Sequence, residues 1–332
     1  MKLNKNTKIF INYFLGPLLF IGLSYALYLQ IKKQPNLETT LESIRRSFHS
    51  PLVWNIVIVI LLMLVNWGIE AIKWKIAVRP IQPVSFLKAF RAILSGVSFS
   101  VIMPNRVGEY LGRVLYMNDG NRLKTISITI VASISQLIIT LLMGCIGWLF
   151  MQPAIENKQL VSSMWSQVIL YGMIAVTIVL TLFYFRLSLL IKWVDRIPGS
   201  KRFAYLVKAL EDFNATLLLR LLSLSALRFV VFTAQYYLLF RLFEVDISWW
   251  QAFWAVSVSF VVMAVIPSIA LIEPVQRGFV MGTIVTLYSP NMVGIGFTAT
   301  GIWFINLFVP AAIGCLLILG IIKMKKIKNE EA

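Results

Sequence analysis

Long apolar runs alternate with short polar linkers along the whole chain. The runs occupy residues 9–29, 52–72, 86–103, 125–151, 168–185, 221–243, 250–266, 275–288 and 292–322. A helix needs about 20 apolar residues to cross a bilayer core, and most of these runs are that long. The pattern therefore predicts an all-α polytopic integral membrane helix bundle that occupies residues 1–332 as one transmembrane domain.

Two regions, 86–118 and 250–288, are interrupted by proline and predict re-entrant helical hairpins. After Lys88 and Arg91, about 12 apolar residues precede the break at Pro104, roughly 18 Å of helix and little more than half of a bilayer core. The second region breaks in the same way at Pro267. Broken backbone at membrane depth is tolerated only where it packs in protein or lines a wet cavity. We expect six full spans plus two hairpins.

The charges of the linkers predict the orientation. The net charge is +17, and lysines and arginines gather in the N-terminus, the 186–220 linker and the tail after Ile322, whereas 152–167 and 244–248 hold few. The positive-inside rule places both termini in the cytoplasm of the cell (inner) membrane, with 9–29 as a retained first span. The 30–51 loop, which carries four basic residues, is the exception. These cations suit anionic lipid headgroups and indicate no nucleic-acid partner.

An internal repeat relates 52–151 to 221–322 across the 186–220 linker. Pro104 aligns with Pro267, Glu109 with Glu273 and Arg113 with Arg277. Further matches are Ser85 with Ser248, Ala71 with Ala234, Gln136-Leu137 with Asn306-Leu307 and Gly144-Cys145 with Gly314-Cys315. Apolar sequence produces chance matches, but proline, glutamate and arginine are rare in such segments. With the predicted topology the repeats are inverted, which is the architecture of alternating-access carriers.

The segment Pro104–Arg113 holds the strongest candidate chemistry. Pro104 ends one half-helix, Asn105 is a candidate N-cap for the next, and Gly108 lies at the same hairpin tip. Arg106, Glu109 and Arg113 share one helix face. Guanidinium groups suit phosphate oxygens, and Glu109 can orient them or take a cationic headgroup. The alternative is a charge ladder that neutralises itself.

Other polar residues in apolar runs extend the candidate list. Glu273 and Arg277 lie one turn apart and form either an internal ion pair or a substrate contact. Arg228 is eight residues inside a span, so we expect it to face the bundle interior. Glu70 and Lys73 are expected to form an interfacial pair. Candidates for cavity lining, or for polar contacts between helices, are Arg91, Ser95, Gln136, Gln235 and Asn306.

Motifs for cofactors and catalysis are absent from the sequence. Cys145 and Cys315 lie deep in apolar runs, and the one histidine, His49, lies in a polar loop. There is no zinc spacing, nucleophile elbow or Walker loop. We expect no metal, no cofactor and no catalytic residue.

At its two hairpins the chain resembles the lysylphosphatidylglycerol synthase transmembrane region, or flippase-like domain family. The likeness consists of Pro-x-Arg-x-Gly-Glu-x-x-x-Arg at Pro104–Arg113 and Pro…Glu…Arg at Pro267–Arg277, with similar lengths between spans. The resemblance implies a bundle of spanning helices and re-entrant hairpins in the cell membrane. In the best-known members of the family this module moves an aminoacylated phospholipid from the inner to the outer leaflet. In the best-known members a cytoplasmic synthase domain is fused to this module. Only a short basic tail follows Ile322, so lipid synthesis is not expected of this chain.

We therefore expect a carrier for a phospholipid or another lipid-linked anionic headgroup. The phosphate would dock on Arg106 and Arg113, with Arg228 and Arg277 approaching from the second repeat. Two alternatives stay open: a lipid- or polyprenyl-linked transferase, and a non-catalytic membrane partner of a lipid-modifying enzyme. The expected partners are the lipid substrate and anionic membrane lipids. A second copy of the chain or a separate lipid-modifying enzyme is left open.

Overall fold

The computed structural model describes residues 25, 37–103, 107–186, 210, 213–267 and 272–330, and every element in these ranges is helical. Five helical segments within them are long and apolar enough to cross a membrane. They are Pro51–Val78, Asp119–Asn157, Ser163–Phe185, Ala215–Leu242 and Met292–Gly320. These correspond to five of the six predicted spans. The sixth, at 9–29, lies outside the described residues, as does most of the 186–220 linker.

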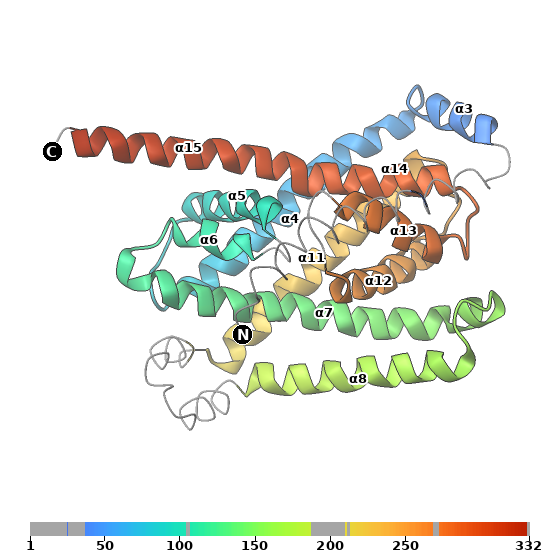
Figure 1. Ribbon diagram of the computed structural model, residues 1–332, viewed down its shortest axis with the longest axis horizontal. Helices are drawn as coiled ribbons and strands as arrows, with labels where there is room; N and C mark the ends of the chain where they lie inside the picture. Colours follow the sequence, from blue (N-terminus) through green and yellow to red (C-terminus); the bar gives the residue numbers. More distant parts are fainter. Residues whose placement is uncertain are drawn as a thin grey trace, which may run out of the picture.

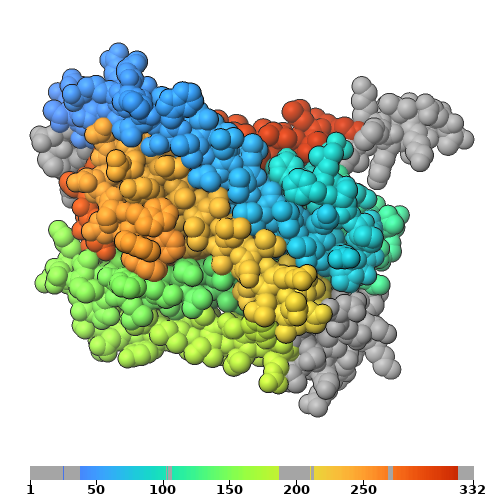
Figure 2. All heavy atoms as spheres, turned by 180° about the vertical axis from the view of Figure 1, so that it is seen from behind, coloured from blue at the N-terminus to red at the C-terminus, as the bar shows by residue number. Residues whose placement is uncertain are grey.

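The long helices form the frame of the bundle. They are α4 (Trp54–Val78), α7 (Arg122–Asn157), α8 (Ser163–Phe185) and α11 (Ala215–Leu242), together with α14 (Met292–Trp303), which a π-helical turn at Phe304–Phe308 joins to α15 (Val309–Glu330). Helix α4 packs along α11 in the middle of the molecule, as Figure 2 shows in blue and yellow. A short helix, α3 (Leu37–Ser47), precedes α4, with the 3₁₀ turn Pro51–Val53 between them.

Both predicted hairpins are pairs of short helices. The first consists of α5 (Phe86–Ile102) and α6 (Gly108–Val114), the second of α12 (Trp249–Val265) and α13 (Glu273–Val285). The two helices of each pair pack together, and Figure 1 shows the two pairs at opposite ends of the bundle. Helices α5 and α12 are each 17 residues long, so neither reaches the length of a full span.

The N-termini of the hairpins are built alike, whereas their tips differ from expectation. The Ser85 hydroxyl accepts from the Lys88 N–H, and the aligned Ser248 hydroxyl accepts from the Gln251 N–H, each at 3.3 Å. Helix α6, however, begins at Gly108 with Val107 as its N-cap and no side-chain cap. The helix thus starts two residues later than an N-cap at Asn105 would place it. Asn105 itself lies outside the described residues, so its role stays a prediction.

Glycines bring the helices of the first hairpin into backbone contact. A Cβ on Gly108 would lie 2.2 Å from the carbonyl of Phe99, and one on Gly112 would lie 2.3 Å from the backbone nitrogen of Gly96. The Gly-x-x-x-Gly spacing of Gly108 and Gly112 places both on one face of α6. Close packing of this kind fixes the position of the charged residues that α6 carries.

Packing between the halves follows the internal repeat. Helix α12 packs on α7, and α5 packs on α15, so each hairpin lies against the long helix of the other repeat. A Cβ on Gly144 would meet Val261 at 2.0 Å and Ser257 at 3.6 Å; one on the aligned Gly314 would meet Ser98 and Leu94. Val261 and Ser257 align with Ser98 and Leu94 at the spacing that relates Pro267 to Pro104. The contacts thus have the exchange symmetry that a repeat predicts. The inverted orientation of the two repeats relative to a membrane stays a prediction.

Candidate functional site

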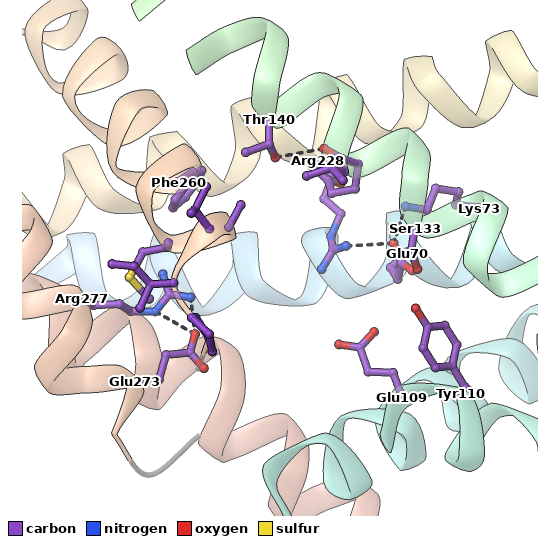
Figure 3. A pocket seen from close by; sticks show the side chains of 17 residues that line it. Glu70, Lys73, Glu109, Tyr110, Ser133, Thr140, Arg228, Phe260, Glu273 and Arg277 are labelled. Carbon is purple, nitrogen blue, oxygen red and sulfur yellow. Dashed lines mark hydrogen bonds and ion pairs between the residues drawn. The ribbon is translucent and has the colours of Figure 1, made fainter. Parts of the chain in front are cut away.

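A cavity of about 590 Å³ lies between the tips of the two hairpins, bordered by the start of α6, the end of α12 and the start of α13. Figure 3 shows its wall, to which α4, α6, α7, α11, α12 and α13 contribute. Its lining residues are Glu70, Lys73, Glu109, Tyr110, Ser133, Gln136, Leu137, Thr140, Arg228, Phe260, Met263, Ala264, Val265, Ile266, Pro267, Glu273 and Arg277. A cavity of this size has the dimensions of a small-ligand site, and more than half of its lining residues are polar or charged.

Glu70 on α4 is the centre of a buried ion network. Its Oε1 accepts from Arg113 Nη2 at 3.1 Å. Its Oε2 lies 2.9 Å from Lys73 Nζ and 2.9 Å from Arg228 Nη1. The Glu70 and Lys73 side chains are 5% and 1% exposed. The expectation of an interfacial pair is therefore wrong in its location: the pair forms, but in the bundle interior, where it joins α4, α6 and α11.

Arg228 on α11 presents one edge to this network and borders the cavity. Its Nε donates to Asn66 Oδ1 at 2.8 Å, its Nη1 donates to Glu70, and its guanidinium carbon lies 5.1 Å from the centre of the Trp67 ring. The side chain is 17% exposed. Held by a carboxylate, an amide and an aromatic face, the guanidinium has a fixed orientation. Among the described residues, no hydrogen bond is found to its Nη2.

Glu109 and Arg113 of α6 join the network from the first hairpin. Arg113 Nη2 lies 3.0 Å from Glu109 Oε2, and the Arg113 side chain is 2% exposed against 20% for Glu109. Arg113 Nε and Nη1 are buried and have no hydrogen-bond partner among the described residues. Figure 3 shows Glu109 between the Glu70 group and the Glu273–Arg277 group. Arg113 thus stands behind the cavity wall and orients Glu109, which lines it.

The second hairpin brings a separate ion pair to the opposite wall. Arg277 Nε donates to Glu273 Oε1 at 3.0 Å, Arg277 Nη2 also contacts Glu273, and Arg277 Nη1 donates to the Tyr236 hydroxyl at 2.9 Å. The side chain of Glu273 is 4% exposed and that of Arg277 is 11% exposed. The aligned pairs Glu109–Arg113 and Glu273–Arg277 therefore both form within their own helices, and each arginine also reaches the long helix that precedes its hairpin.

Polar contacts extend from the cavity through the helices around it. Lys73 Nζ donates to the Ser225 hydroxyl at 3.3 Å, and Ser225 lies 2.8 Å from the Ser135 hydroxyl. Asn66, which holds Arg228, also donates to Asn306 Oδ1 at 3.4 Å. Asn306 lies in the π-helical turn, a geometry that often marks functional sites. The network thus connects α4, α6, α7 and α11 with the turn between α14 and α15.

The structure brings four of the six predicted substrate-binding residues to the cavity wall: Glu109, Arg228, Glu273 and Arg277. Arg113 lies behind it, and Arg106 lies outside the described residues together with Pro104 and Asn105. Pro267 follows the end of α12 at Val265, lines the cavity and accepts from Gln276 Nε2 at 3.2 Å.

Of the five candidates for cavity lining, only Gln136 is found on this wall. Ser95 contacts the Tyr116 hydroxyl, Gln235 donates to the Val59 carbonyl, and Asn306 contacts Asn66, so these three are buried polar contacts between elements. Arg91 lies at a different pocket. Ser95, Gln235 and Asn306 thus follow the second of the two alternatives, polar contacts between elements, and Arg91 lines a pocket other than the central one.

Sequence reasoning missed several members of the wall. Tyr110 follows Glu109 directly, and the apolar end of α12 supplies Phe260 and Met263. Lys73 was recognised only as a partner of Glu70. Lys73 directly follows the apolar run 52–72, so its position in the sequence favoured an interfacial residue over one that lines a cavity. No signal existed for the apolar residues, whose orientation depends on packing.

The charges that line the cavity balance. Three carboxylates, from Glu70, Glu109 and Glu273, face three cations, from Lys73, Arg228 and Arg277. Such a wall offers sites to a negative and a positive group at once. Within the described residues there is no group of three His, Cys, Asp or Glu side chains that could hold a metal ion.

Comparison with known proteins agrees with this architecture. The sequence profile described as the lysylphosphatidylglycerol synthase TM region matches residues 14–314. No curated protein matches the chain. Because the profile covers most of the 332 residues, the chain belongs to the family of the lysylphosphatidylglycerol synthase transmembrane region.

Proposed function

We propose that this protein moves a phospholipid, or another lipid with an anionic headgroup, between the leaflets of a membrane by way of the central cavity. The observation that carries the proposal is the balanced set of buried charges where two half-spanning hairpins meet. Buried charges in membrane domains are costly and mark substrate or ion pathways. Membership of a flippase-like family supports the same reading.

The cavity suits a headgroup that carries a phosphate and an amino group. The phosphate would bind Arg228 and Lys73, competing with the Glu70 carboxylate that holds them now. The amino group would bind Glu109, whose side chain is more exposed than that of its partner Arg113. Because guanidinium and ammonium groups already have carboxylate partners, exchange for a phosphate conserves the number of ion pairs.

The acyl chains need not enter the cavity. Val265 and Ile266 belong both to the cavity wall and to the exposed surface, with 77% and 37% of their area exposed. This apolar edge gives the headgroup a lateral path while the tails remain in the bilayer. We further propose that both termini face the cytoplasm of the cell membrane, and that transport is downhill or coupled to an ion, since the sequence holds no Walker loop.

Reconstitution in liposomes tests the proposal. Labelled phospholipids with zwitterionic, anionic and aminoacylated headgroups are placed in the inner leaflet, and their arrival outside is measured with an impermeant quencher. We expect transfer of at least one class above protein-free vesicles, and a loss of about tenfold or more in Arg228→Gln. Lys158→Gln, which removes an exposed cation of the α7–α8 loop, is the matched control and should behave as wild type.

Two outcomes would favour other functions. Unchanged lipid distribution across the whole panel would reject translocation and leave the non-catalytic partner. Formation of a modified lipid that requires a divalent metal would favour a transferase. Circular dichroism and gel filtration of each variant show whether a loss of transfer reflects unfolding instead.

A further inference from the structure

A second charged pocket, of about 820 Å³, lies at the outer flank of the first hairpin. The start of α5, the end of α6, the start of α7 and the last described side chains of α15 surround it. Its lining residues are Lys88, Arg91, Leu115, Tyr116, Met117, Asn118, Asp119, Arg122, Leu316, Leu317 and Gly320. It shares no lining residue with the central cavity.

The charge of this pocket is unbalanced, unlike that of the central cavity. It holds three cations and one carboxylate. Arg122 is paired with Asp119 at 2.6 Å. Lys88 and Arg91, one turn apart on α5, have no ion-pair partner among the described side chains. The first turn of α5 also carries the positive end of the helix dipole. Two unpaired cations therefore face the pocket beside a helix N-terminus.

The opposite wall of the pocket is apolar and continues onto the outer surface of the bundle. Leu316 lines the pocket and is 70% exposed, and Leu319, one turn along α15, is 63% exposed. In a membrane domain such leucines meet lipid chains. A cationic wall next to a lipid-facing apolar wall matches an amphiphile with a phosphate at one end.

The fold itself does not require these charges. At the spacing that relates Glu109 to Glu273, the pocket residues Leu115, Tyr116 and Asp119 align with Phe279, Val280 and Thr283. Those three line a pocket of about 470 Å³ on the flank of the second hairpin, which has no charged residue. The two pockets share only these three aligned positions. At the spacing that relates Pro104 to Pro267, Lys88 and Arg91 align with Gln251 and Trp254, which are uncharged and do not line the second pocket. The second hairpin therefore folds without cations at these positions.

We propose that the flank pocket of the first hairpin is a binding site for the phosphate of an anionic membrane phospholipid, separate from the central cavity. Lys88 and Arg91 bind the phosphate oxygens, and Leu316 and Leu319 contact the acyl chains. This binding does not depend on the proposed translocation. The flank pocket would hold a lipid at one end of the bundle even if no lipid passed through the central cavity. By the charge of the linkers, that end faces the cytoplasm.

Binding of phosphatidylglycerol to the purified full chain tests this site. Affinity is measured in nanodiscs of phosphatidylcholine by native mass spectrometry as the phosphatidylglycerol fraction is raised. We expect Lys88→Gln/Arg91→Gln to weaken binding about tenfold or more. The matched control, Lys124→Gln/Arg186→Gln, removes the same charge from the start of α7 and the end of α8, residues that do not line the pocket. It should change the affinity less than twofold.

Further arms separate the site from its alternatives. Adding Lys88→Gln/Arg91→Gln to Arg228→Gln should lower the remaining affinity by the same factor as it does in the wild type, because the two cavities share no lining residue. Soluble glycerol 3-phosphate should compete at least a hundredfold more weakly than the lipid, because it lacks chains for α15. The proposal is overturned if both double variants lose equal affinity, which would indicate a diffuse surface charge. Unchanged affinity in Lys88→Gln/Arg91→Gln, or equal binding of glycerol 3-phosphate, would overturn it as well.

Discussion

The two hairpins occupy equivalent positions in the repeats but hold their aligned ion pairs in different surroundings. Arg113 of the first hairpin reaches Glu70, a carboxylate that also binds two other cations. Arg277 of the second reaches the hydroxyl of Tyr236, a neutral group. The repeat thus sets where the pairs lie, whereas the residues on α4 and α11 set how strongly each pair is coupled to the rest of the bundle.

The largest expected effect on stability comes from replacing Glu70, which couples the ion pair of the first hairpin to two other cations. Glu70→Gln leaves Lys73, Arg113 and Arg228 buried around a neutral amide, which we expect to cost about 3–5 kcal/mol of stability. Glu273→Gln should cost less, because Arg277 keeps Tyr236. Thermal unfolding in detergent, with Glu38→Gln on the exposed face of α3 as control, measures both.

Charge compensation sharpens this prediction. Replacing Arg113 as well, in Glu70→Gln/Arg113→Met, should recover part of the loss, because one uncompensated cation is removed. Strictly additive losses would show that Glu70 and Arg113 are not coupled, and an equal cost for Glu70→Gln and Glu273→Gln would remove the asymmetry between the halves.

An intermediate effect concerns the aligned glycines. Gly314→Ala should cost about 1–3 kcal/mol, because its Cβ would lie 2.1 Å from the carbonyl oxygen of Leu94, which is backbone. Gly144→Ala should cost less, because its nearest contact is the tip of the Val261 side chain.

Second substitutions separate the two cases. Val261→Ala should rescue Gly144→Ala, whereas Ser98→Ala should not rescue Gly314→Ala, since the Leu94 carbonyl stays in place. Denaturation of the four variants measures this, and rescue of both glycine variants would contradict the backbone contact at Gly314.

The smallest effect tests the neutral partner of the second hairpin. Tyr236→Phe removes the hydroxyl that accepts from Arg277 and should cost about 1 kcal/mol, the usual net value of one hydrogen bond. The neighbouring Tyr237→Phe is the matched control, since no hydrogen bond of its hydroxyl is found in the described ranges. Equal unfolding temperatures for the two variants would show that the Tyr236 contact contributes nothing.

Much of the fold follows from the sequence, because apolar run length and proline position act locally. Five long helices and both hairpins lie where the runs predict them. The first span at 9–29 and the tip at Pro104–Arg106 stay predictions.

The site was less predictable because its contacts join distant segments. Of the three cations that contact Glu70, only Lys73 lies near it in the sequence. Arg113 and Arg228 reach Glu70 from other helices. Gln136 lines the cavity and the aligned Asn306 does not, although both are polar residues in apolar runs. Which helix face meets the cavity depends on packing, and a single sequence does not show it.

The central claim is that a lipid headgroup occupies the cavity between the hairpin tips. Crosslinking with a phospholipid that carries a photoreactive headgroup tests this most directly, with the modified peptides identified by mass spectrometry. We predict labels on α12 near Phe260 and Met263 and on α6 near Tyr110, all removed by excess unlabelled lipid and reduced in Arg228→Gln. Labels confined to outward-facing residues of α8, such as Tyr171 and Leu182, would contradict the account.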